Sequence, residues 1–215
     1  GYATGNVVYS EGSYLYNYQN PGNLTPFDNS HLYNGTDRGN YTENSFAGIA
    51  IGKNTNIQET GNPTYYSGLA IGNYAQATGG ISFALGHYAQ ALSPSAMALG
   101  TATKASGFNS LAMMRQSAAE GEFSAALGTA SWAKGNGSFA MGYSATAKAD
   151  QSIAIGAAET IKLPGQQHGT PSAQYNANGN TVTEGVRSLA FGTKARTSTA
   201  AADSMAFGSS SSTGG

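Results

Sequence analysis

A five-residue pattern recurs along the chain: a small residue, a large apolar residue, alanine, a second large apolar residue and glycine. Two typical copies are Gly68-Leu69-Ala70-Ile71-Gly72 and Ser152-Ile153-Ala154-Ile155-Gly156. The central alanines stand at positions 50, 70, 84, 98, 112, 126, 140, 154, 190 and 206, and the six consecutive steps between 70 and 154 are equal, at fourteen positions each. A fixed short period of this kind is the signature of a repeat architecture, in which each unit packs on its neighbours.

Each unit has a second half, in which two small residues flank a variable one, as in Ala75-Gln76-Ala77. In both halves the side chains alternate at every second residue, which is typical of a strand. Fourteen residues are also two heptads, but a coiled coil needs apolar residues about every 3.5 positions, and each glycine would cost a helix about 1 kcal/mol. We therefore expect an all-β fold, a parallel β-solenoid of fourteen-residue coils, each with two short strands and two tight turns.

The two faces of the pattern predict which side chains lie inside a coil. So short a coil encloses little space, so we expect the small residues inside and the large apolar residues outside. Ten stacked coils would then expose an apolar stripe about 45–50 Å long, more than a soluble monomer normally leaves uncovered. No other segment is apolar enough to cover it, which favours a homo-oligomer. The alternative places the large residues inside a monomeric solenoid.

We assign the subunit interface to the large positions of the pattern. Among these positions only Ala125 breaks the rule, and a second departure is Met114, which replaces the glycine of its unit. The predicted interface residues are Ile49, Ile51, Leu69, Ile71, Phe83, Leu85, Met97, Leu99, Leu111, Met113, Leu127, Phe139, Met141, Ile153, Ile155, Leu189, Phe191, Met205 and Phe207.

Stacked units with a Ser-x-Ala-x-Gly core resemble the head domain of trimeric autotransporter adhesins, the YadA-like group. The resemblance covers about residues 45–210, and Gln151-Ser152-Ile153-Ala154-Ile155-Gly156 and Asn109-Ser110-Leu111-Ala112-Met113 are its closest forms. It implies a left-handed parallel β-roll, a homotrimer, and adhesion to host cells or extracellular-matrix proteins. It also implies a place on the bacterial cell surface, distal from an outer-membrane anchor that this fragment lacks. The tyrosine-rich start and a long insertion resemble the ubiquitous surface proteins of Moraxella.

Two segments lie outside the repeat. Residues 1–44 contain seven of the 13 tyrosines, and residues 45–215 hold the repeats. We interpret 1–44 as a cap that covers the first coil, with direct ligand binding as the alternative. Residues 157–186 form a hairpin-like insertion that either binds a ligand or braces a neighbouring chain.

The composition excludes several classes of function. Only 10% of the residues are charged and the net charge is -1, so nucleic acid is not an expected partner. The chain has no cysteine and no apolar run long enough to span a membrane, and we expect no direct membrane contact of this fragment. His31, His87 and His168 lie in different segments, and the serines of the pattern form a column with no base beside it. We expect neither an enzyme nor a metal or cofactor.

Three aromatic residues mark a candidate ligand-binding surface. We expect Tyr74, Tyr88 and Trp132 on the outward face of the second strand, with Tyr74 and Tyr88 stacked on adjacent coils because they are one full period apart. Stabilisation of the ladder is the alternative role. The predicted function is an adhesin head, and the alternative is a structural spacer that displays another module. An ice- or polysaccharide-binding solenoid is disfavoured, because regular threonine arrays and clustered carboxylates are missing.

Overall fold

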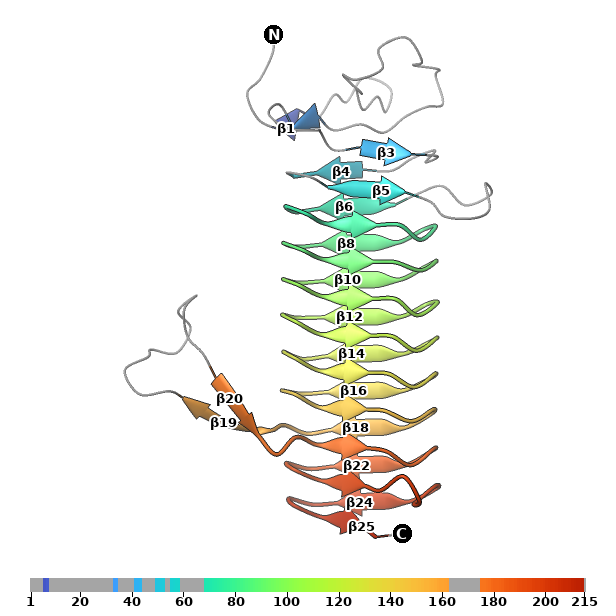
Figure 1. The fold of residues 1–215 in the computed structure, drawn as a ribbon, viewed down its shortest axis with the longest axis vertical. Coiled ribbons are helices and arrows are strands. Elements are labelled where there is room, and N and C mark those ends of the chain that lie inside the picture. Colours follow the sequence, from blue (N-terminus) through green and yellow to red (C-terminus); the bar gives the residue numbers. More distant parts are fainter. Residues whose placement is uncertain are drawn as a thin grey trace.

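The computed structural model describes residues 6–7, 33–34, 41–43, 49–52, 55–58, 68–162 and 175–214. Most of these residues form a stack of coils, each of which contributes one strand to each of two parallel sheets (Figure 1). Neighbouring strands pair one full sequence period apart, as where Met97 pairs with Leu111. The predicted parallel β-solenoid is confirmed, and one coil corresponds to one sequence unit.

The first sheet contains the recurring pattern. Its strands pair through their central alanines, so Ala84 lies beside Ala98 and Ala98 beside Ala112. In chain order they are β4 (Ile49–Ile51), β6 (Leu69–Ile71), β8 (Phe83–Leu85), β10 (Met97–Leu99), β12 (Leu111–Met113), β14 (Ala125–Leu127), β16 (Phe139–Met141), β18 (Ile153–Ile155), β22 (Leu189–Phe191) and β24 (Met205–Phe207).

The second sheet contains the other half of each unit. Most of its strands have only two residues, but backbone hydrogen bonds on both sides continue the ladder, for example from Gln76 to Ala89 at 2.8 Å. In chain order they are β3 (Tyr41–Glu43), β5 (Asn56–Gln58), β7 (Gln76–Ala77), β9 (Gln90–Ala91), β11 (Lys104–Ala105), β13 (Ala118–Ala119), β15 (Trp132–Ala133), β17 (Thr146–Ala147), β21 (Val182–Thr183), β23 (Arg196–Thr197) and β25 (Ser212–Thr213).

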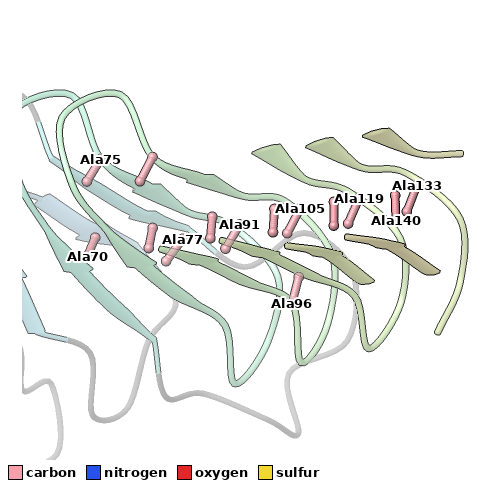
Figure 2. Packing of buried hydrophobic residues seen from close by; sticks show 14 of the residues in the cluster. Ala70, Ala75, Ala77, Ala91, Ala96, Ala105, Ala119, Ala133 and Ala140 are labelled. Atoms are coloured by element: carbon pink, nitrogen blue, oxygen red, sulfur yellow. The ribbon is translucent and has the colours of Figure 1, made fainter. Parts of the chain in front are cut away.

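Alanine fills the space between the two sheets. Ala91, Ala105, Ala119 and Ala133 of the second sheet follow one another along the stack, and each is fully buried (Figure 2). The large residues of the first sheet lie on the other side of their strands, and Leu85 is 46% exposed. The predicted orientation is confirmed, and the alternative that places the large residues inside the coil is wrong, because methyl groups already fill the interior.

Two turns close each coil, and they form the two long edges of the stack. We call the turns that follow first-sheet strands the A edge and the turns that follow second-sheet strands the B edge (left and right in Figure 1). Most of these turns contain one residue with a φ between 50° and 65°, for example Tyr88 at 56° on the A edge and Ser95 at 58° on the B edge. This left-handed residue reverses the chain direction within a few residues.

The glycine that ends most first-sheet patterns accommodates the close approach of the next coil. Gly86 has a φ of 134°, which side-chain-bearing residues rarely adopt, and a Cβ added there would lie 2.3 Å from the carbonyl oxygen of Gly100. Glycine avoids both problems because it has no Cβ. A residue with a side chain at position 86 would therefore force the backbone of its own coil or of the next coil to shift.

Gly86→Ala is expected to lower the free energy of unfolding by about 1–3 kcal/mol or more, because strain and the backbone collision add. The matched control is Gly137→Ala, since Gly137 has a φ of 63° and an added Cβ would meet only the Cγ of Gln151 at 3.7 Å. Thermal unfolding followed by circular dichroism compares the two. Equal melting temperatures for the two variants would contradict this account of the glycine.

A hairpin leaves the stack from the A edge after β18. Its strands, β19 (Glu159–Lys162) and β20 (Tyr175–Asn178), are antiparallel and project away from the coils (Figure 1). The ladder shows where the added segment begins and ends. Ala158 takes the place that Ser144 has one coil earlier, because its N–H donates to the Tyr143 carbonyl as the Ser144 N–H donates to the Thr129 carbonyl. Thr181 takes the place of Ala145, because its carbonyl accepts from the Thr146 N–H as the Ala145 carbonyl accepts from the Trp132 N–H. The added segment is therefore 159–180, narrower than the 157–186 expected from the sequence.

The chain before the repeats is described only in part. β1 (Asn6–Val7) and β2 (Tyr33–Asn34) pair antiparallel, and β3 pairs with β5, so the second sheet begins ahead of residue 45. The remainder of the predicted 1–44 cap, with five of its seven tyrosines, lies outside the described residues.

Candidate interface and recognition surfaces

The outer face of the first sheet is a continuous apolar stripe. Each described coil contributes two large side chains, except at Ala125, and each of those whose side chain is described is half-buried or exposed. Phe191 and Phe207 stack on each other with ring centroids 4.8 Å apart, and Phe207 is still 69% exposed. Side chains in a column shield one another along the stack, but the described residues supply nothing to cover their outward ends. Only the side chain of Ile49 among the predicted interface residues lies outside the described part of the chain.

The outer face of the second sheet is polar. The Lys104 ammonium lies 3.5 Å from Glu120, and Lys148 lies 2.5 Å from Glu184. The hydrogen bond from Lys148 lowers the pKa of the Glu184 carboxyl. These exposed pairs contribute little to stability, but they keep this face hydrated. The two sheets therefore differ in the surfaces they present, and only the first resembles an interface.

Trp132 is a large aromatic residue on this polar face. Its side chain is 36% exposed, and the Lys134 ammonium lies 5.5 Å from the ring centroid. A cation over an indole face is attracted by the ring quadrupole. Trp132 therefore forms a small amphipathic patch that the neighbouring coils, with Ala118 and Thr146 at the equivalent positions, do not repeat.

Tyr74 and Tyr88 stack as predicted, but on the A edge. Their rings are nearly parallel, at 4° and 4.7 Å between centroids, and His87 packs edge-on against Tyr88 at 4.4 Å. Both tyrosines are the left-handed residues of their turns. Because the strand begins only at Gln76 or Gln90, strand alternation does not extend back to them. The expectation that they share the face of Trp132 is wrong, and the structure forms two separate patches.

The B edge carries exposed apolar residues that the sequence analysis missed. Phe108 is 41% exposed and Phe123 is 61% exposed, and their rings meet edge to face at 5.5 Å. Ile81 and Val186 are exposed on other coils of the same edge. A large apolar residue in a turn where other units have serine, asparagine or glycine is the sequence signal that could have identified them.

The base of the hairpin is fixed to the stack. The Lys194 ammonium, one coil further on, lies 2.7 Å from the Glu159 carboxylate, and this hydrogen bond lowers the pKa of the carboxyl. The Asn180 amide donates to the Thr146 hydroxyl at 3.1 Å. Thr146 and Val182 are buried although their positions point outward on the second sheet. The return of the hairpin therefore covers part of the polar face.

The serine column serves the turns. Ser124, Ser152, Ser188 and Ser204 each donate to the backbone carbonyl three residues earlier, at 2.5–2.7 Å. Three further hydroxyls of the column, those of Ser82, Ser110 and Ser138, are buried with no hydrogen-bond partner among the residues that the structure describes. All but Ser204 are buried at the start of their strands.

Neither a metal cluster nor a membrane-spanning helix is found in the part of the chain that the structure describes. No group of three or more histidine and acidic side chains gathers there. None of its segments is a helix long and apolar enough to cross a membrane. His87 is exposed in an A-edge turn, whereas His31 and His168 lie outside the described residues.

Comparison with protein-family models matches the YadA head domain repeat over residues 66–89, 91–113, 119–144, 133–158 and 184–211. The chain belongs to the YadA head-domain family. The matched segments are coils of the solenoid, and they leave out the hairpin β19–β20. Comparison with curated proteins finds no match. The narrower likeness to the Moraxella proteins stays a prediction.

Membership of the family defines the class of molecule. YadA heads belong to trimeric autotransporter adhesins, which are surface-exposed outer-membrane proteins, and the family is one of structural adhesin domains and not of enzymes. In this YadA head the regular coils provide the scaffold. The stripe is common to nearly all coils. Individual coils are distinguished by the A-edge tyrosines, the Trp132 patch, the B-edge phenylalanines and the hairpin.

Proposed function

We propose that this YadA head is a homotrimer on the bacterial cell surface that attaches to host cells or extracellular-matrix proteins. The observation that carries the proposal is the apolar stripe of the first sheet, which extends along the stack with its side chains half-buried or exposed. Soluble monomers seldom leave so long an apolar surface in water. A second and third copy of the same chain have the same coil spacing, so their stripes match it residue for residue.

Adhesion is supported by the family and by how the surface residues are distributed. With a net charge of -1, the chain lacks the charge excess needed to capture a ligand by electrostatic attraction. The candidate ligand contacts are Tyr74 and Tyr88 on the A edge and Trp132 on the polar face. A trimer would present three copies of each patch, so weak individual contacts could combine into stronger multivalent binding.

The test of adhesion is binding of the intact chain to a panel of immobilised matrix proteins and host receptors. We expect binding to at least one large host or matrix protein that persists at raised salt, because aromatic and polar contacts are not screened as charge pairs are. If a folded trimer binds no member of the panel, the alternative of a structural spacer is favoured instead.

Three variants test where the ligand binds. The first variant combines Tyr74→Ala with Tyr88→Ala, the second is Trp132→Ala, and the third lacks residues 159–180. We expect at least one of them to bind the ligand about tenfold more weakly or worse, because aromatic anchors dominate interfaces. The deletion joins Ala158 to Thr181, which the ladder places at consecutive positions. Arg196→Ala on the same polar face is the control. Circular dichroism and sedimentation establish that each variant is folded and trimeric.

The deletion also separates the two roles of the insertion. Weaker binding by an intact trimer would assign the hairpin to the ligand, whereas a trimer that dissociates more readily would assign it to a neighbouring chain. If all three variants bind as the parent does, the recognition site lies elsewhere on the molecule.

A further inference from the structure

Met114 occupies a backbone position that suits glycine. In the other described units this position is glycine with a φ of 113–154°, whereas Met114 has a φ of 82°. Left-handed backbone is unfavourable for a residue with a side chain and persists only where something compensates. The Met114 side chain gains little packing within its own chain, because it is 54% exposed on the A edge.

The opposite edge is unusual at the same level of the stack. Phe108 comes before Met114 in the chain and Phe123 comes after it, each within a single period, so Met114 lies at a height between the two rings. Among the described B-edge turns, only these two carry an aromatic ring. Phe108 and Met114 lie at opposite ends of strand β12, so they do not meet within one chain.

Cyclic symmetry brings these two edges together between chains. Three copies that turn their first sheets toward a common axis form the walls of a triangular prism, with the coils at equal heights. In a threefold assembly each contact is heterologous, so the A edge of one chain meets the B edge of the next at every corner. This step rests on the proposed homotrimer.

We propose that Met114 of one chain packs against Phe108 and Phe123 of the next chain at each corner of the trimer. The contact places a flexible thioether against aromatic rings, an arrangement that favours sulfur at the ring edge. It would cover three of the most exposed apolar side chains outside the stripe, and it accounts for a methionine where the fold favours glycine. The same seam passes Tyr74 and Tyr88, so a ligand bound there would contact two chains.

Cross-linking tests the contact, because the chain contains no native cysteine. Met114→Cys is combined with Phe108→Cys or with Phe123→Cys, and the trimer is treated with a short bismaleimide. A disulfide is unsuitable, since side chains of this length hold their Cα atoms farther apart than about 7 Å. We expect covalent dimers and trimers on a denaturing gel from at least one pair.

The matched control also pairs an A-edge cysteine with a B-edge cysteine, but it places the two at different heights along the stack. Met114→Cys with Val186→Cys places the second thiol four coils beyond Phe108, roughly 19 Å along the stack, and should leave the chains uncoupled. The four single-cysteine variants, at positions 108, 114, 123 and 186, should also remain uncoupled. A trimer by sedimentation in which neither Met114 pair exceeds these controls would overturn the contact while the homotrimer stands. A monomeric parent would overturn both.

Met114→Gly gives a second measurement. Glycine restores the residue of the other units, so each chain should fold as before, but the trimer should dissociate at about tenfold higher concentration or more because three corner contacts are lost. Unchanged dissociation on dilution would count against the contact.

Discussion

Ala126→Leu is expected to disrupt the stack severely, and Ala112→Leu should do the same. Both alanines are fully buried between the two sheets, where the neighbouring coils leave space for a methyl group only. Overpacking a core typically costs about 1–3 kcal/mol per site, and a trimer incurs the cost three times. We expect a large fall in melting temperature or loss of soluble protein.

Ala125→Leu is the matched control for this prediction. Ala125 is adjacent to Ala126 in the same strand but points outward, at a position where other units have leucine, isoleucine, phenylalanine or methionine. The same substitution should therefore be tolerated there and should extend the stripe. If Ala126→Leu melts like the parent, or if Ala125→Leu is the more damaging change, the assignment of inner and outer faces fails.

Leu85→Asp and Met141→Asp are each expected to abolish trimer formation while each chain keeps its coils. Leu85 is 46% exposed and Met141 is 47% exposed in the single chain, so a carboxylate at either position can stay hydrated in a monomer. In the trimer, three carboxylates would be brought together in an apolar interface, which costs several kcal/mol. A loss of more than about 4 kcal/mol raises the dissociation constant about a thousandfold.

Gln90→Asp adds the same charge to the polar face of the second sheet and serves as the control. Gln90 is half-buried beside Gln76, with which it shares an amide contact at 3.5 Å, and it lies away from the stripe. We expect this variant to remain trimeric in sedimentation experiments. If Leu85→Asp and Met141→Asp associate as tightly as Gln90→Asp does, the stripe is not the subunit interface.

The fold was predictable because two simple periods agree. Six equal steps between the central alanines set the coil length, and alternation within the pattern set the faces, so Ala98 could be placed inside and Leu99 outside without a structure. A shift of one residue would exchange the two faces, which is why the register is so strongly specified.

The turns were not predictable to the same degree. A left-handed residue interrupts the alternation, so Tyr74 was expected on a strand face and lies on the A edge instead. Phe108 and Phe123 were not recognised, because their turn positions hold unrelated residues in other units. Thr181-Val182-Thr183 differs from the alanine pattern of the second half, although it forms an ordinary rung of the second sheet, so the insertion was expected to be longer than it is.

The molecular mass in solution tests the central claim, that the stripe of this YadA head is an interface between copies of one chain. Sedimentation equilibrium at micromolar concentration measures it without reference to shape. The account predicts a single species of three times the 21.9 kDa chain mass. A single species of 21.9 kDa would contradict it, because the apolar stripe would then be exposed to water in a stable monomer.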